Sequence, residues 1–219
     1  MQAVANESDR VTRRLLACGI AAGPVFFAVA IGQALTRAGY DIRRNAISQL
    51  SLGTEGWIQI ASFLVTGLLA VASAIGIRRA LKGQSGGTWG ALLVGGLGLG
   101  LILAGIFPPD PGFGFPPGAP AGPPTTMSGH AAGHALGFFV SMISTIAGTI
   151  VFARRFRSHG ERGLFSYLIA STVAAPVLVG LSAAFMSWGG VIVAVAGAVM
   201  FGWVAVVAAR LRSELAPAG

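Results

Sequence analysis

Charged residues are scarce in this sequence. Only 10% of its 219 residues are Asp, Glu, Lys or Arg, while 54% are apolar and the mean hydropathy is +0.75. A soluble domain carries about 25% charged residues, so this chain has too few charges to cover a water-soluble surface. The scarcity of charge excludes a soluble globular domain. The abundance of apolar residues excludes a disordered chain, because such a chain has too little apolar surface to bury.

Cysteine and acidic residues are scarcer still. Cys18 is the only cysteine, which excludes an intrachain disulfide. The chain has seven acidic residues, and none lies near the middle of a long apolar segment. A proton-driven transporter is expected to keep an acid at that depth. Transport is therefore the least favoured of the functions considered below.

Long apolar segments make up most of the chain. Each is close to the roughly 20 residues that a helix needs to cross a bilayer, and only helices or closed barrels satisfy their backbone hydrogen bonds in lipid. The sequence predicts an all-α, polytopic bundle of six transmembrane helices over residues 15–209. Residues 1–14 and 210–219 are predicted as tails. The segments are 15–35, 57–77, 88–107, 130–152, 164–188 and 190–209.

Lys and Arg are distributed unevenly between the connections. Twelve of the 15 fall in the two tails and in the second and fourth connections, and three, Arg37, Arg43 and Arg44, fall in the first. Cytoplasmic loops are enriched in Lys and Arg, so both termini are expected in the cytoplasm of a multi-pass cell-membrane protein. The net charge of +8 then matches anionic lipid headgroups. The lipid bilayer is the expected partner, and nucleic acid is not.

Two kinds of small or rigid residue mark further features. Eight of the 11 prolines lie in segment 108–128, which predicts an extended, polyproline-like outer loop that acts either as a lid or as a spacer. Glycines also recur at four-residue spacing, which lets helices approach closely. These rows favour packing within the bundle, with a homodimer face as the alternative. They are Gly19/Gly23, Gly96/Gly100 and Gly129/Gly133/Gly137.

Candidate catalytic residues gather on the predicted outer side. His130 and His134 are four residues apart and share one helix face, and Asp110 precedes them in the proline-rich loop. These three side chains are candidate ligands for zinc or another divalent metal, whose bound water could attack an ester or amide. Position 131 is Ala, so the Glu of the H-E-x-x-H motif is missing. In the alternative interpretation the histidines cap the helix entrance by bonding loop carbonyls or Asp110.

The first outer connection supplies the other candidates. Its stretch 42–52 predicts a short amphipathic helix at the membrane interface. Arg43 and Arg44 can bind a phosphate or carboxylate, or they can form salt bridges that tie the loops together. Ser48, with a histidine as base, is a further catalytic candidate. The candidate substrate-binding residues are Asp41, Arg43, Arg44, Asn45 and Gln49.

The same region resembles a prokaryotic membrane family known as domain of unknown function 998. The resemblance is carried first by Gly39, Tyr40, Asp41, Arg44, Ile47, Ser48 and Leu50, then by Gly56, Trp57, Phe63 and Gly67, and later by Phe107, Pro108 and Asp110. A histidine at the start of the fourth segment, His130 or His134, completes the pattern. The resemblance implies a six-helix architecture with a polar outer cluster, but it does not indicate an activity, because none is established for the family.

A weaker likeness is to ceramidase-like membrane hydrolases, which hold zinc with three histidines beside Ser and Asp. The chain has Ser48, Asp110 and a histidine pair, but its third histidine, His159, is predicted on the opposite side. The sequence therefore predicts a multi-pass membrane protein with a polar Asp/Arg/Ser/His cluster at its outer face. An enzyme acting on a lipid or isoprenoid, a non-catalytic protein that binds a lipid-like ligand, and a small-molecule transporter all stay open.

Overall fold

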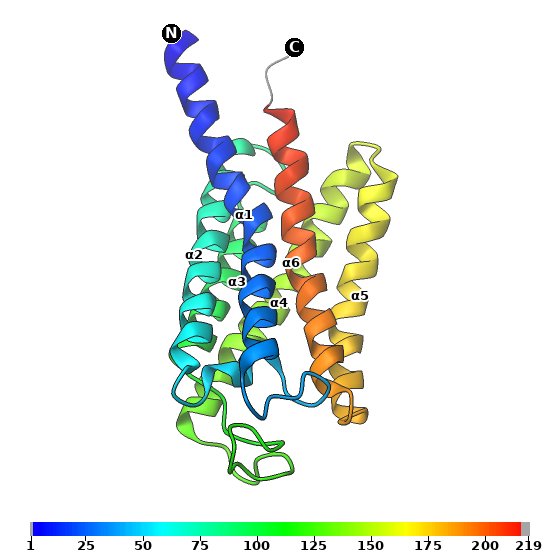
Figure 1. Ribbon diagram of the computed structural model, residues 1–219. Helices are drawn as coiled ribbons and strands as arrows, with labels where there is room; N and C mark the ends of the chain where they lie inside the picture. The colour runs from blue at the N-terminus through cyan, green and yellow to red at the C-terminus, as the bar shows by residue number, and fades with distance from the viewer. Residues whose placement is uncertain (1, 216–219) are drawn as a thin grey trace.

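The structure, a computed structural model, describes residues 2–215 and contains six α-helices and one short 3-10 helix in that range (Figure 1). All six α-helices are long and apolar enough to cross a membrane. The predicted all-α architecture with six candidate spans is thereby confirmed. The elements are α1 (Gln2–Thr36), η1 (Ile47–Ser51), α2 (Gly56–Ala80), α3 (Trp89–Ile106), α4 (Gly129–Ser158), α5 (Arg162–Ala184) and α6 (Gly189–Glu214).

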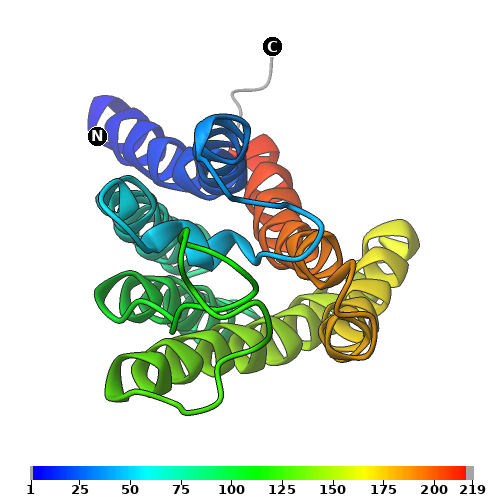
Figure 2. The same ribbon diagram turned by 60° about the horizontal axis from the view of Figure 1, so that its bottom comes forward.

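The six helices form a closed ring. Each helix packs against the next one in the sequence, and α6 packs against α1 (Figure 2). Large side chains such as Phe152 and Trp203 are fully buried between them. Helix α5 is the most peripheral, since it buries only Leu168, Ser171 and Ala175. The ring leaves room at its centre for the cavity described below.

The two ends of the bundle differ in character. The start of α1 and the end of α6 lie at one end, together with the α2–α3 and α4–α5 connections (Figure 1); we call this the terminal end. The opposite end carries the α1–α2, α3–α4 and α5–α6 connections, and we call it the loop end. Because the helices alternate in direction, the twelve basic residues counted above fall at the terminal end. Arg37, Arg43 and Arg44 fall at the loop end.

Glycines let neighbouring helices touch through their backbones. A Cβ built on Gly67 of α2 would lie 2.6 Å from the carbonyl oxygen of Gly98 on α3, and one built on Gly98 would lie 2.6 Å from the carbonyl oxygen of Gly67. The same holds for one pair from the rows noted in the sequence, because a Cβ on Gly137 of α4 would lie 2.6 Å from the carbonyl oxygen of Gly100. A Cβ on Gly19, Gly23, Gly96 or Gly133 would instead lie closest to a side chain of another segment, and one on Gly129 would have nothing within 4 Å. Apart from Gly129, the glycines of these rows thus pack within the chain. A homodimer through these faces stays a prediction.

Helix boundaries depart from the predictions at the chain ends. Helix α1 begins at Gln2 and α6 continues to Glu214, so residues 2–14 and 210–214 of the predicted tails are helical. Met1 and residues 216–219 of these tails lie outside the described residues.

The predicted helix over 42–52 is wrong apart from η1. The side-chain oxygen of Asn45 accepts a hydrogen bond from the N–H of Asp41 at 2.8 Å, and that of Asp41 accepts one from the N–H of Arg43 at 3.0 Å. Such local bonds compete with helix formation. The backbone therefore turns before Ile47 and forms a helix only from there.

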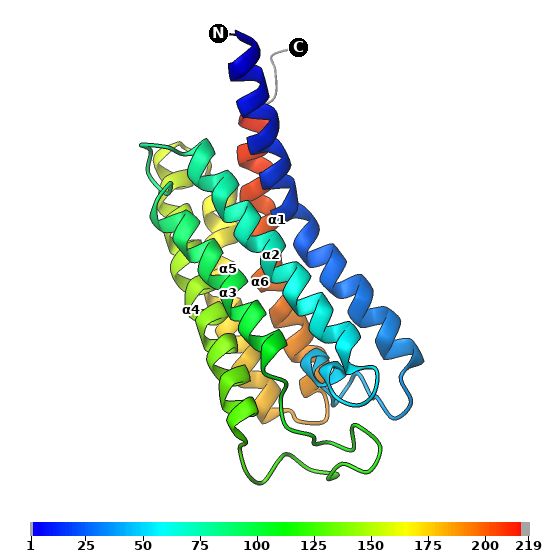
Figure 3. The same ribbon diagram turned by 90° about the vertical axis from the view of Figure 1, so that its left-hand side faces the viewer.

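The proline-rich loop is compact and not extended as predicted. It folds back on itself through bonds from the N–H of Phe113 to the carbonyl of Gly122 and from the N–H of Gly114 to the carbonyl of Pro120, both at 2.8 Å. Phe115 inserts under it and is fully buried. The loop lies across the loop end, against the α1–α2 connection (Figures 2 and 3).

Candidate functional site

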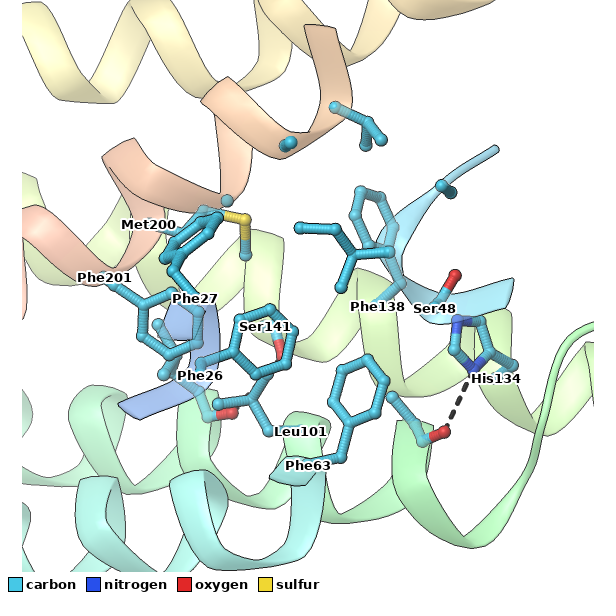
Figure 4. Close-up of a pocket in the computed structure, with 17 residues that line it drawn as sticks. Phe26, Phe27, Ser48, Phe63, Leu101, His134, Phe138, Ser141, Met200 and Phe201 are labelled. Atoms are coloured by element: carbon cyan, nitrogen blue, oxygen red, sulfur yellow. Dashed lines mark hydrogen bonds between the residues drawn. The ribbon is translucent and has the colours of Figure 1, made fainter. Parts of the chain in front are cut away.

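A cavity lies at the centre of the helix ring. It has a volume of about 120 Å³ and is lined mainly by aromatic and aliphatic side chains from α1, α2, α3, α4, α6 and the η1 region (Figure 4). We call it the central cavity. Its polar lining is confined to Ser48, His134 and Ser141. The labelled apolar residues of the lining are Phe26, Phe27, Phe63, Leu101, Phe138, Met200 and Phe201.

A second and larger hollow, of about 690 Å³, opens at the loop end. We call it the loop-end groove. It is bounded by the α1–α2 connection, the proline-rich loop, the start of α4 and the α5–α6 connection. Its lining is mixed, with Arg44 and Asp110 of opposite charge and the hydroxyls of Thr125 and Thr126.

The two hollows meet at three shared residues. Ala46, Ser48 and Val193 line both the central cavity and the loop-end groove. Ser48, on η1, is the polar member of this junction. Within the described residues its hydroxyl has no hydrogen-bond partner, so it remains available to a molecule that passes from the groove into the cavity.

His134 projects from α4 into the central cavity with a defined ring orientation. Its Nδ1 is 2.9 Å from the carbonyl oxygen of Phe107 and 3.1 Å from that of Ala104. A carbonyl oxygen only accepts, so Nδ1 carries the proton and donates it. In the neutral ring Nε2 is then unprotonated and is an acceptor. Figure 4 shows this second nitrogen on the side of the ring that faces Ser48.

His130 has a different environment, although it lies only one turn away. It is exposed, and its ring stands 5.8 Å from that of Phe107, edge to face. The structure therefore separates the two histidines into one that faces the cavity and one that faces outward. His134 bonds carbonyls, as the alternative interpretation expects of a histidine, but these carbonyls belong to the end of α3 and not to the loop.

Asp110 forms a hydrogen bond with the residue that caps the start of α4. Its carboxylate accepts a hydrogen bond from the N–H of Ser128 at 2.8 Å, and the Ser128 hydroxyl accepts one from the N–H of Ala131 at 3.1 Å. Hydrogen bonding by Ser128, through its side chain and then its backbone, lowers the pKa of Asp110, with a smaller contribution from His130. Asp110 is therefore an anion at neutral pH and lines the groove in that form.

The predicted metal ligands are not gathered by the fold. Among residues 2–215 no three His, Cys, Asp or Glu side chains lie close enough together to hold a metal ion. The Nδ1 of His134 is within hydrogen-bond distance of two carbonyl oxygens, and the Asp110 carboxylate accepts a hydrogen bond from the N–H of Ser128. His159 caps the far end of α4, so the third histidine of the ceramidase-like pattern is missing at the loop end. These residues do not fit a zinc centre of that kind.

The predicted substrate-binding residues divide into an exposed ion pair, two buried side chains and Arg44, which belongs to neither group. Arg43 and Asp41 form an exposed ion pair at 2.9 Å. Hydrogen bonding from the Arg43 side chain is the main cause of the lowered pKa of Asp41. Arg44 donates to the carbonyl of Ala121 at 2.9 Å and forms no ion pair within the described residues. It is the arginine that lines the groove.

Asn45 and Gln49 are buried and join the loops. The Gln49 side chain accepts from the Asn45 amide and from the N–H of Ala46, both at 3.1 Å, and donates to the carbonyl of Gly112 at 2.9 Å. Asn45 also donates to the carbonyl of Phe113 at 3.4 Å. Their side-chain polar atoms are thus used inside the protein, although Gln49 forms part of the groove wall.

One important residue, Arg37, was not among the predicted site residues. Its guanidinium donates to the carbonyls of Leu50 at 3.0 Å and Leu52 at 2.6 Å and pairs with Glu55 at 2.9 Å. Only 7% of its side chain is exposed. A sequence signal existed, since Arg37 follows an apolar segment directly, but its partners depend on how the loop folds. The phenylalanines of the cavity were also missed.

Comparison with known proteins shows which family the chain belongs to. Neither a curated protein nor a solved structure matches the chain. The predicted resemblance is confirmed, because a family model described as protein of unknown function DUF998 matches residues 20–210, which is most of the chain. The six-helix chain, with its central cavity and its loop-end groove, belongs to the DUF998 family.

Proposed function

We propose that this protein binds a small amphiphile at the outer face of the cell membrane. In this proposal the terminal end, with its twelve basic residues, lies in the cytoplasm, and the loop end lies outside. The polar outer cluster then consists of Ser48, Arg44, Asp110 and His134. The observation that carries the proposal is the junction at Ser48, where an apolar cavity inside the bundle joins a mixed-charge groove at its surface.

The size of the central cavity sets the apolar part of the ligand. Its volume of about 120 Å³ is near that of the roughly 150 Å³ engineered cavities that bind benzene. An apolar group of about six carbons fits, such as a short alkyl chain or the end of an isoprenoid. The phenylalanine lining favours such a group because burial from water is worth roughly 25 cal/mol per Å² of apolar surface.

The loop-end groove sets the polar part of the ligand. Arg44 and Asp110 line it, and neither forms an ion pair with another described residue. A guanidinium binds phosphate strongly, and a carboxylate attracts a cationic group. The groove therefore suits a head that carries both charges, and its volume of about 690 Å³ is ample for one.

Binding of hexylphosphocholine, which has a six-carbon tail and a zwitterionic head, tests the proposal. Gly197 lines the cavity, and a Cβ there meets only Phe27, at 3.6 Å. Leucine at this position is expected to fill the cavity. Gly180 of α5 has nothing within 4 Å of a built Cβ, so Gly180→Leu is the matched control.

The expected result is a saturable rise in melting temperature for the wild type and for Gly180→Leu, and none for Gly197→Leu. A second cavity-filling variant, Ala194→Leu, covers the case in which Gly197→Leu fails to fold. Binding that is unchanged in a folded cavity-filled variant contradicts the proposal, and so does a wild type that does not respond.

A second candidate function is hydrolysis of an acyl ester of such an amphiphile. It is favoured by His134, whose Nδ1 donates to two carbonyls and leaves Nε2 as a base on the side of Ser48 (Figure 4). In this reaction Ser48 Oγ attacks the ester carbonyl and its proton passes to Nε2. The alcohol leaves with that proton, and water, activated by the same nitrogen, then hydrolyses the acyl-serine.

A hexyl fluorophosphonate, which modifies activated serines, distinguishes the two functions. Hydrolysis predicts labelling of Ser48 that is absent in Ser48→Ala and slower in His134→Gln. A wild type that binds hexylphosphocholine but is not labelled contradicts the hydrolase and retains the binding function.

A further inference from the structure

A third hollow shares no lining residue with the central cavity and lies on the outer surface of the ring between α2 and α3. It has a volume of about 760 Å³, and we call it the α2–α3 groove. Figure 3 shows the two helices side by side on the face turned to the viewer. Because this face points away from the ring centre, the groove opens to the surrounding lipid.

The walls of the groove are apolar for most of their length. Exposed side chains of Leu68 and Ile75 on α2 and of Leu92 and Leu99 on α3 line it. Its depth comes from Gly95, where a built Cβ meets only Ala74, at 3.7 Å. From Ile102 to Thr88 the groove follows about 20 Å of α3, at 1.5 Å per residue. That exceeds the roughly 15 Å half-thickness of a bilayer core.

The groove ends in positive charge. Arg78, Arg79 and Thr88 line it at the terminal end. Arg79 is held in place, because its guanidinium donates to Thr12 at 3.0 Å and to Ser8 at 3.1 Å on α1. Arg78 is exposed and has no hydrogen bond or ion pair within the described residues. The groove therefore presents two guanidinium groups at the terminal end of its apolar walls.

We propose that the α2–α3 groove is a binding site for one anionic phospholipid of the leaflet at the terminal end. One acyl chain lies along the apolar walls over Gly95, and the phosphate contacts Arg78 and Arg79 beside the Thr88 hydroxyl. The match of charge selects an anionic lipid over a zwitterionic one, since an arginine near the surface attracts anionic lipid by about 1 kcal/mol, or about fivefold. The site is independent of the central cavity and of its ligand.

Native mass spectrometry of the full-length protein tests this site. The protein is transferred from nanodiscs of phosphatidylcholine containing a minor fraction of phosphatidylglycerol. The wild type is expected to retain one phosphatidylglycerol, and Arg78→Gln to retain it about fivefold less. Arg154→Gln removes an exposed arginine of α4 at the same end and should bind as the wild type does.

Gly95→Leu tests the apolar wall separately from the charge. It is expected to abolish retention by filling the groove, whereas Gly180→Leu on α5 leaves it intact. Inorganic phosphate is expected not to displace the lipid. Three results would overturn the site: equal retention in Arg78→Gln and the wild type, displacement by phosphate, or a protein dimer that Gly95→Leu dissociates, because a second copy would then occupy this face.

Discussion

The guanidinium carbon of Arg37 lies 5.2 Å from the centre of the Phe115 ring, and both side chains are buried. The same guanidinium bonds the carbonyls of Leu50 and Leu52 and pairs with Glu55. One side chain thus joins the end of α1, the η1 turn, the start of α2 and the proline-rich loop. These segments include walls of the loop-end groove, so its shape depends on Arg37.

Arg37→Gln is expected to lower the free energy of unfolding by about 2–4 kcal/mol, because hydrogen bonds to a charged group are worth about 1.5–3 kcal/mol each. Reversible unfolding in mild detergent measures the loss. Arg43→Gln is the control. Its ion pair with Asp41 is exposed, and such pairs contribute about 1 kcal/mol or less. Equal losses in the two variants would show that Arg37 does not organise the loop end.

Gly67→Ala is expected to destabilise the bundle by about 1–3 kcal/mol, because the added methyl group meets the carbonyl oxygen of Gly98 at 2.6 Å. Gly180→Ala, on the open face of α5, is expected to be neutral or to stabilise by up to about 1 kcal/mol through helix propensity. Unfolding of both variants in the same detergent gives the comparison. A Gly67→Ala protein as stable as Gly180→Ala would contradict the backbone contact between α2 and α3.

The raised pKa of Tyr40 leads us to expect a loss of stability at high pH. Burial first, and the nearby Asp41 second, raise the pKa of Tyr40 above its ordinary value of 10.0, and its hydroxyl donates to the carbonyl of Asn45 at 3.0 Å. The fold therefore favours the neutral phenol. Its contribution is present below about pH 10 and is lost as the unfolded phenol ionises above that pH.

Melting temperatures between pH 8 and pH 11 test this dependence. The wild type is expected to lose stability above about pH 10, and Tyr40→Phe, although less stable at pH 8, is expected to lose less. Parallel curves for the two proteins would assign the alkaline loss to other groups.

The architecture could be predicted from the sequence because lipid leaves few alternatives. A backbone in a bilayer must satisfy its hydrogen bonds within each helix, so six apolar segments are sufficient to predict six helices. The alternation of basic residues between the connections predicts which of them share an end, because Lys and Arg are enriched on one side of a membrane. Family membership was also recognisable, since the pattern from Gly39 to Gly67 lies in one continuous stretch.

The site was only partly predictable, because its contacts join residues far apart in the sequence. Helical spacing places His130 and His134 on one face, but α3 ends at Ile106. Only His134 lies close enough to bond the carbonyls at the end of α3. Similarly, Gln49 meets Gly112 across 63 positions. No local pattern shows that a polar residue in the first connection is used by the proline-rich loop and is not left free for a ligand.

The stability of a Gln49→Glu variant is expected to rise on acidification. Such a rise would show that the Gln49 amide donates a hydrogen bond to the carbonyl of Gly112. The side-chain oxygen of Gln49 accepts from Asn45 and Ala46, while its nitrogen donates to the carbonyl of Gly112 at 2.9 Å. A carboxylate keeps the accepted bonds but faces that carbonyl without a proton. A protonated carboxyl group restores the donor. Burial at 6% exposure also raises the pKa of the new acid.

The folded variant therefore favours the protonated form of its new carboxyl group, and its stability is lost as the pH rises above the ordinary pKa of about 4.3. At pH 7.5 the variant is expected to be less stable than the wild type by about 1–3 kcal/mol, and the difference is expected to shrink toward pH 4.5. Thr54→Glu adds the same charge at an exposed position of the same connection and is expected to show no such recovery. A constant difference for Gln49→Glu across this range would mean that the donor to Gly112 contributes nothing to closing the loop end.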